Sequence, residues 1–262
     1  MGANAVINEN PTSTVVKHSI GKTLSFSTSE SFKSLRTNLS YSFADYEGCR
    51  VIGVTSADRF EGKTTTAINL AYTLMESGKK VLLMECDLRL PSFSEKLKIP
   101  SSPGLSNVLI NPTQNRLSSL IEYNNTNLYF LTSGDIPPNP SELLASKAMG
   151  ELIDYYSTVF EYILLDLPPT LAVTDAPVVS KYTNGLLFVV RHNLTDRLRL
   201  RDSMYQLSLV DARILGFVYN CSPRTENRTR TKYGYRYGSE QYYKGHNNTT
   251  KRSILNRRKL KK

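Results

Sequence analysis

Short apolar runs alternate with helix-like segments along most of this chain, and this alternation limits the possible folds more than any other feature. The apolar runs lie at residues 51–55, 80–86, 128–134, 162–168, 185–190 and 213–220. Helical periodicity marks residues 64–77, 141–157 and 195–209. Because the runs are continuously apolar, both faces of each strand should be buried. The sequence therefore predicts an α/β domain with a mostly parallel sheet flanked by helices.

The two ends of the chain differ from this domain. Residues 1–28 are polar and carry no period, so we expect a mobile arm followed by a domain at residues 29–223. Within residues 29–43 the spacing of Phe32, Leu35 and Leu39 predicts a helix, with Thr28 or Ser29 as its N-cap. After residue 223 the apolar pattern stops, and residues 224–262 are expected to form a disordered tail.

Composition excludes several classes of protein. No apolar run approaches the length of about eighteen residues that spans a bilayer, and the N-terminus lacks the pattern of a secretory signal. The three cysteines and three histidines are scattered, so neither a disulfide framework nor a metal centre built from them is expected. We therefore expect a cytoplasmic protein.

A strand, a loop and a helix at residues 51–77 have the pattern of a phosphate-binding loop. The strand "VIGVT" leads into "SADRFEGKTTT", in which Gly62, Lys63 and Thr64 stand directly before the helix. Such a loop needs backbone amides, a lysine for the β- and γ-phosphates, a hydroxyl for Mg²⁺ and a helix N-terminus. Ala57 replaces the first glycine of G-x-x-x-x-G-K-[ST]. Taken alone, the loop is thus also compatible with an ordinary strand–turn–helix unit.

Acidic residues follow two other predicted strands. Glu85 and Asp87 stand at the end of the strand in "VLLMECDLRLP", and Asp166 ends the strand in "YILLDLPP". A buried carboxylate is costly without a positive partner, and ligands bind at the carboxyl ends of parallel strands. Each acidic residue alone could cap a helix. Together with the loop, they predict that the chain binds ATP with Mg²⁺.

These segments resemble the bacterial tyrosine kinases (BY-kinases). "EGKTTTAINLAYTL" resembles their Walker A loop and helix, "VLLMECDLRLP" their Walker A′ motif and "YILLDLPP" their Walker B strand. "PGLSNVL", "IPPNPSELLAS" and "VTDAPVVSKYTNGLLFVVR" also follow the family, and the resemblance runs from about residue 30 to residue 220. It implies a P-loop NTPase fold of the deviant Walker (MinD/ParA-like) type.

The resemblance also implies roles for single residues. It assigns catalytic roles to Lys63, Glu85, Asp87 and Asp166. Glu85 stands where the family usually has an aspartate that is thought to help activate the tyrosine hydroxyl. Thr64, Asp87 and Asp166 are implied ligands of Mg²⁺. Implied contacts to the nucleotide come from Ala57, Glu61, Gly62, Lys63, Thr64 and Thr65.

Two other stretches depart from the family pattern. Arg59 and Phe60 replace the common Pro-Gly pair of the loop. Lys33 stands where the N-terminal motif usually has arginine, between Glu30 and Arg36. The resemblance implies ring-like self-association through these three residues of the N-terminal helix.

The C-terminal tail combines positive charge with tyrosines. It carries 13 Lys/Arg against 2 Asp/Glu, a balance of +11 where the whole chain has +10. Basic residues among tyrosines also suit nucleic-acid stacking, and the last residues suit an anionic membrane surface. With this domain in front, autophosphorylation is favoured and nucleic acid is not expected. The expected sites are Tyr233, Tyr235, Tyr237, Tyr242 and Tyr243.

The resemblance implies an ATP- and Mg²⁺-dependent protein-tyrosine kinase that phosphorylates its own tail and regulates capsular or exopolysaccharide synthesis and export. The implied partners are a tyrosine phosphatase and a transmembrane polysaccharide chain-length regulator. This regulator would activate the kinase and recruit it to the inner face of the cell membrane. Two alternatives stay open: a nucleotide-binding pseudokinase that scaffolds the polysaccharide machinery, and a partitioning or septum-positioning ATPase.

Overall fold

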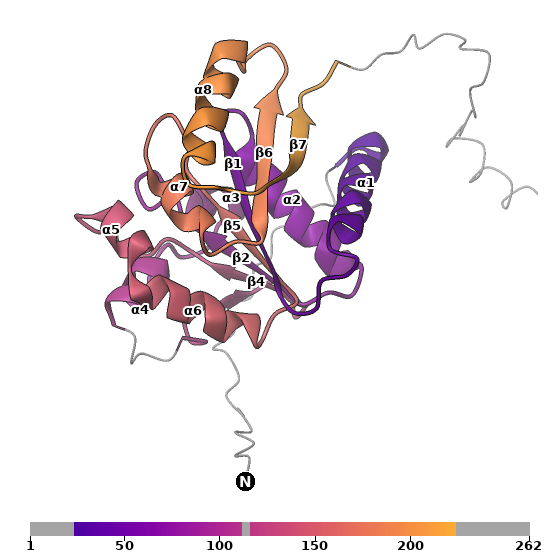
Figure 1. Ribbon diagram of the computed structural model, residues 1–262. Helices are drawn as coiled ribbons and strands as arrows, with labels where there is room; N and C mark the ends of the chain where they lie inside the picture. Colours follow the sequence, from indigo (N-terminus) through magenta and orange to yellow (C-terminus); the bar gives the residue numbers. More distant parts are fainter. Residues whose placement is uncertain (1–23, 112–115, 224–262) are drawn as a thin grey trace, which may run out of the picture. The chain divides into compact units, whose positions relative to one another are not determined.

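The described residues form a seven-stranded sheet with helices on both faces (Figure 1). This computed structural model describes residues 24–111 and 116–223. The strand order is β3-β4-β2-β5-β1-β6-β7. All neighbouring strands pair in parallel except β3 and β4. The strands are β1 (Arg50–Ser56), β2 (Val81–Glu85), β3 (Ile121–Glu122), β4 (Leu128–Leu131), β5 (Tyr162–Asp166), β6 (Gly185–Arg191) and β7 (Ile214–Asn220).

Two apolar cores lie between the sheet and its helices, one on each face of the sheet. One face carries α1 (Phe26–Ser42), α2 (Lys63–Glu76) and α3 (Phe93–Leu97), which contribute Leu39, Leu70 and Phe93 to its core. The opposite face carries five helices, with core residues such as Leu105, Met149 and Leu207. These helices are α4 (Leu105–Ile110), α5 (Pro140–Ala145), α6 (Lys147–Ser157), α7 (Asp175–Ser180) and α8 (Arg197–Ser208).

The predicted parallel sheet is confirmed. All five residues of β2 and all five of β5 are buried, as continuously apolar runs require. Helix α2 is the next element after β1 and ends at Glu76, with Ser77 as its C-cap, after which Gly78 adopts a φ of 85°. This left-handed conformation is typical of a glycine that terminates a helix. The six apolar runs correspond to β1, β2, β4, β5, β6 and β7.

Some element boundaries differ from the prediction. The first helix begins at Phe26, and its N-cap is Ser25, whose side chain accepts a hydrogen bond from the Thr28 amide. The segment at residues 141–157 forms two helices, because Ser146 between them is extended, with φ −65° and ψ 157°. The predicted helix at residues 195–209 begins at Arg197, since the side chain of Asp196 caps it.

The sheet order determines where the polar strand ends meet. β5 lies between β2 and β1, and Asp166 pairs in register with Glu85 on one side and Val54 on the other. The carboxyl ends of these three strands therefore lie next to one another, at the edge where α2 begins. β6 borders β1 on its other side, so the segment after β6 also reaches this edge.

Candidate active site

The loop between β1 and α2 presents its last residues at the N-terminus of a long helix. Gly62 is the N-cap of α2, with a φ of 96°, and Lys63 is the first residue of the helix. A Cβ atom at position 62 would lie 2.1 Å from Nδ2 of Asn220. Both the backbone conformation and this close approach therefore require glycine. The positive end of the helix dipole and its free amides favour an anion here.

Two predicted carboxylates lie beside the predicted lysine. Oδ2 of Asp87 is 3.7 Å from Nζ of Lys63, and both side chains are largely buried. The side chain of Asp166 is buried, and its Oδ1 atom has no hydrogen-bond partner. Burial raises the pKa of Asp166 to about 7, while Lys63 and the Thr64 hydroxyl counteract this rise. The structure thus brings together Lys63, Thr64, Asp87 and Asp166, as the sequence predicts.

These groups fit a site for Mg²⁺. In the described ranges no three His, Cys, Asp or Glu side chains gather in a way that could hold a metal ion. Mg²⁺ usually takes only one or two carboxylates and completes its shell with phosphate oxygens and water. Asp87, the partnerless oxygen of Asp166 and the hydroxyl of Thr64 match this incomplete donor set.

Glu85 is engaged in a different way. Its Oε1 accepts hydrogen bonds from the amides of Ser92 and Phe93, and its Oε2 accepts one from the amide of Ser133 at 3.1 Å. The Phe93 bond measures 2.7 Å. Burial raises the pKa of Glu85, and the three amides oppose that rise. The carboxylate therefore joins the start of α3 to the segment after β4, and both of its oxygens are occupied.

A second polar group near this edge was not predicted from the sequence. Nε of Arg89 lies 3.1 Å from Oδ2 of the fully buried Asp175, and Nη2 of Arg89 donates to Oγ of Ser141 at 2.8 Å. Ser141 in turn donates to Oδ1 of Asp175. This cluster joins the segment after β2 to α5 and α7. Arg89 and Asp175 stand 86 positions apart, so only the fold could reveal the pair.

The remaining predicted nucleotide contacts occupy different environments. Ala57 is fully buried at the start of the loop, and Glu61 is buried with 1% of its surface exposed. Thr65 is exposed on the first turn of α2. Asp58 and Phe60 also belong to this loop, and Phe60 adopts a φ of 64°. The loop therefore combines amides at a helix N-terminus with side chains that range from fully buried to exposed.

The three residues predicted for self-association lie on α1. Nζ of Lys33 pairs with Oε1 of Glu30 at 2.8 Å, and this contact raises the pKa of Lys33. Nη1 of Arg36 donates to the carbonyl of Thr73 on α2 at 3.0 Å. Arg36 thus also fastens α1 to α2. The five tail tyrosines lie outside the described residues, and no described helix is long and apolar enough to cross a membrane.

The buried charge of Asp166 should lower the stability of the nucleotide-free protein. Replacing Asp166 by Asn removes a buried carboxylate in which one oxygen has no hydrogen-bond partner, so the free energy of unfolding at pH 8 should rise by about 1–3 kcal/mol. The folded pKa of about 7 lies above the ordinary value of 3.8, so the folded state holds a proton that the unfolded chain loses between these values. Wild-type stability should therefore fall as the pH rises from about 4 to 7.

Denaturant titrations at pH 5 and pH 8 test this expectation. The stability gain of the Asn variant should be large at pH 8 and small at pH 5, where the wild-type carboxyl is mostly protonated in the folded state. Equal stabilities of the two proteins at pH 8 would contradict it.

Comparisons with known proteins agree with this geometry. A family model described as an AAA domain matches residues 49–180. The tyrosine-protein kinase YwqD of Bacillus subtilis is 33% identical over 215 residues, which cover 82% of this chain and 88% of YwqD. The putative tyrosine-protein kinase CapB of Staphylococcus aureus is 31% identical over 81% of this chain and 91% of CapB. The crystal structure of the chimerical protein CapA2B2 superposes with a TM-score of 0.70 at 33% identity, over 74% of this chain and 85% of the chimera.

The family model spans the loop and the strand ends that form the candidate site, and the similar kinases include chains nearly as long as this one. The chain therefore belongs to the family of bacterial tyrosine kinases.

Proposed function

We propose that this chain transfers the γ-phosphoryl group of ATP to tyrosine and that its own C-terminal tyrosines are substrates. One observation carries the proposal: the ammonium of Lys63 and the carboxylates of Asp87 and Asp166 meet at the N-terminus of α2. Phosphoryl transfer depends mainly on positioning and on stabilisation of the developing charge. A lysine, a helix N-terminus and two carboxylates at one edge supply these requirements.

In the proposed reaction the phenolic oxygen forms a bond to the γ-phosphorus, the bond from that phosphorus to the β-phosphate oxygen breaks, and ADP leaves. Lys63 contacts the β- and γ-phosphates and offsets the charge on the leaving group. Thr64, Asp87 and Asp166 would hold Mg²⁺, which when bound neutralises phosphate charge. The phenolic proton passes to a carboxylate of the site or to water. Amides around Gly62, with Ala57 and Glu61 of the same loop and Thr65 of the first turn of α2, bind and orient the phosphates.

The proposed substrates are Tyr233, Tyr235, Tyr237, Tyr242 and Tyr243. They belong to a tail with a balance of +11, which would be attracted to a site rich in carboxylates and phosphate. We further propose activation by the cytoplasmic segment of a transmembrane polysaccharide chain-length regulator and dephosphorylation by a tyrosine phosphatase. The name of the CapA2B2 chimera, which joins a CapA and a CapB designation, is consistent with such a partnership. Residues Glu30, Lys33 and Arg36 would contribute to ring-like self-association.

The experiment that tests this proposal incubates the purified protein with Mg²⁺-ATP, with and without the regulator segment, and quantifies phosphotyrosine over time. Phosphotyrosine that accumulates faster with the segment supports both the kinase and its activation. ATP binding without any phosphotyrosine would instead support the pseudokinase scaffold.

Glu85 has two candidate roles, and one variant separates them. Glutamine at position 85 offers a single acceptor oxygen to the amides of Ser92, Phe93 and Ser133. If Glu85 mainly holds these segments, Glu85→Gln should lower the free energy of unfolding by about 1–3 kcal/mol and slow phosphoryl transfer by about tenfold, a modest positioning loss. Thermal denaturation and initial rates measure both effects. Unchanged stability with a rate as low as that of a Lys63 variant would instead favour the predicted role in activating the tyrosine hydroxyl.

A further inference from the structure

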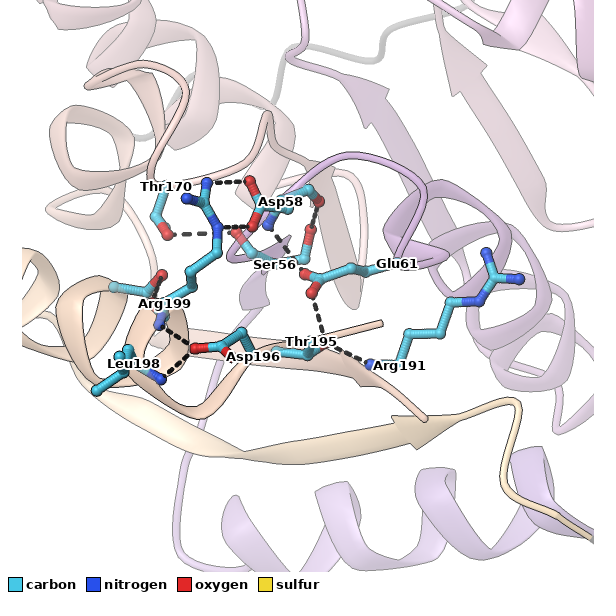
Figure 2. A network of polar contacts seen from close by, with 10 residues as sticks. Ser56, Asp58, Glu61, Thr170, Arg191, Thr195, Asp196, Leu198 and Arg199 are labelled. Carbon is cyan, nitrogen blue, oxygen red and sulfur yellow. Dashed lines mark hydrogen bonds and ion pairs between the residues drawn. The ribbon is translucent and has the colours of Figure 1, made fainter. Parts of the chain in front are cut away.

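Four side chains from outside the phosphate loop contact it, and Figure 2 shows three of them, Arg191, Thr195 and Arg199. They come from the end of β6, the turn after it, the first turn of α8 and the end of β7. We call these four residues the clasp: Arg191, Thr195, Arg199 and Asn220. Their partners lie within residues 58–61, directly before Gly62 and Lys63.

The first contact of the clasp is a two-bond ion pair. Nε and Nη2 of Arg199 donate to the two carboxylate oxygens of Asp58. Figure 2 shows the guanidinium facing the carboxylate with both bonds in parallel. This two-bond geometry fixes orientation as well as distance, unlike a single contact between flexible side chains. The Asp58 contact raises the pKa of Arg199.

The second contact passes through a buried carboxylate of the loop. Oε2 of Glu61 accepts the amide N–H of Asp58 at 3.0 Å, and Oε1 accepts the hydroxyl of Thr195. Oγ1 of Thr195 accepts the amide N–H of Arg191 at 2.8 Å. Glu61 therefore closes the loop on itself and joins it to the end of β6.

The last two contacts hold loop carbonyls. Nη1 of Arg191 donates to the carbonyl of Phe60 at 2.6 Å, and Nδ2 of Asn220 donates to the carbonyl of Glu61 at 2.9 Å. Phe60 adopts a φ of 64° although its side chain is 82% exposed. Residues other than glycine rarely adopt this conformation without support. The two contacts hold the carbonyls of Phe60 itself and of the next residue, Glu61, and supply that support.

We infer that the clasp sets the conformation of the phosphate loop before nucleotide binds, with Arg199 as its principal positioning residue through Asp58. Ala57, Arg59 and Phe60 lack the conformational freedom that glycines would give this loop. Glycine-rich loops reach their conformation through the freedom of the glycine backbone. In this loop, long-range side-chain contacts hold the conformation instead. The inference rests on the proposed function only in that the loop is taken to bind the phosphates of ATP.

The structure offers a matched control on the same helix. Arg201 is an exposed arginine of α8 whose guanidinium pairs with its neighbour Asp202 instead of with the loop. Arg201→Ala removes the same side chain from the same helix as Arg199→Ala. A difference between the two variants therefore reports the clasp rather than helix α8 in general.

Hydrogen exchange of the nucleotide-free protein is the first test. In Arg199→Ala the amide of Asp58, which donates to Glu61 within the loop, should exchange about tenfold faster than in wild type, because opening of the loop loses its main restraint. Exchange in β1 and α2 should not change, and Arg201→Ala should match wild type throughout. Equal loop exchange in the Arg199 variant and wild type would overturn the inference.

Affinity for Mg²⁺-ATP, measured by calorimetry, is the second test. Arg199→Ala, Asp58→Ala and the double variant should each raise Kd by about tenfold and to the same extent, since the two residues act as one unit. The exchanged pair Asp58→Arg with Arg199→Asp should recover most of the affinity. Asp58→Asn removes the negative charge of Asp58 and leaves the shape of its side chain nearly unchanged. Additive losses in the double variant, or a loss of the same size in Arg201→Ala, would overturn the inference. A wild-type protein that binds ATP but forms no phosphotyrosine would refute the proposed kinase activity and leave both readouts of the clasp intact.

Discussion

Replacing Lys63 by methionine should lower the initial rate of ATP-dependent tyrosine phosphorylation by roughly a hundred- to a thousandfold, the usual loss when one stabilising donor is removed. Lys63 is the first residue of α2, and its Nζ atom lies 3.7 Å from Asp87. Methionine keeps much of the length and apolar character of the side chain but removes the charge. The variant should fold, while the transition state loses the positive charge that we propose Lys63 supplies to the β- and γ-phosphates.

A matched control for this experiment is Lys79→Met. Lys79 pairs with Glu161 at 2.8 Å, close to the amino-terminal ends of β2 and β5, at the opposite edge of the sheet. Initial rates of phosphotyrosine formation should be unchanged in this control. A Lys63 variant that retains more than a tenth of the wild-type rate would contradict the assignment of the loop.

Replacing all five tail tyrosines by phenylalanine should reduce tail phosphorylation to background while the affinity for Mg²⁺-ATP stays within about twofold, since phenylalanine removes only the hydroxyl that accepts phosphate. The positions are Tyr233, Tyr235, Tyr237, Tyr242 and Tyr243. The proposed nucleotide site is built from residues of the described domain, which this variant leaves unchanged. Intact mass spectrometry measures the number of phosphates for each chain.

A mixing experiment adds the direction of transfer. The five-phenylalanine variant has an intact site and no acceptors, whereas the Lys63→Met variant has acceptors and an impaired site. If transfer occurs between subunits, the mixture should accumulate phosphate on the tail of the Lys63 variant. Phosphate that appears in neither protein would indicate transfer within one chain, and equal phosphate on the five-phenylalanine variant and wild type would contradict the tail assignment.

Much of the fold follows from the sequence because its strands are buried on both faces. Continuous apolar runs and helical segments predicted six strands and the order of the larger helices. The short helices α3, α4 and α7 were not predicted, because five or six residues do not complete enough turns to display a helical period. The break at Ser146 was also missed, since the helices before and after it continue one apolar pattern.

The candidate site was predictable to the extent that it depends on strand ends. Lys63, Asp87 and Asp166 come together because parallel strands present their carboxyl ends at one edge. The contacts of Glu85 to Ser92, Phe93 and Ser133 depend on how two loops fold back, which no spacing reveals. The contacts of the clasp were even less predictable from the sequence.

Asp58 and Arg199 are 141 positions apart and meet because β6 lies beside β1. The unusual residues of the loop can be identified from the sequence, but the distant residues that contact the loop cannot. The sequence alone shows that the residues replacing glycine in the loop depart from the family pattern. The contacts that hold the loop appear only in the structure.

The most direct test of the account is to map phosphotyrosine by mass spectrometry after incubation of the full chain with Mg²⁺-ATP and the cytoplasmic segment of its proposed regulator. The account predicts phosphate on tyrosines between residues 233 and 243, present in wild type and absent from Lys63→Met incubated alone. ATP binding without phosphate on any of these tyrosines would contradict it and would leave a nucleotide-binding scaffold in its place.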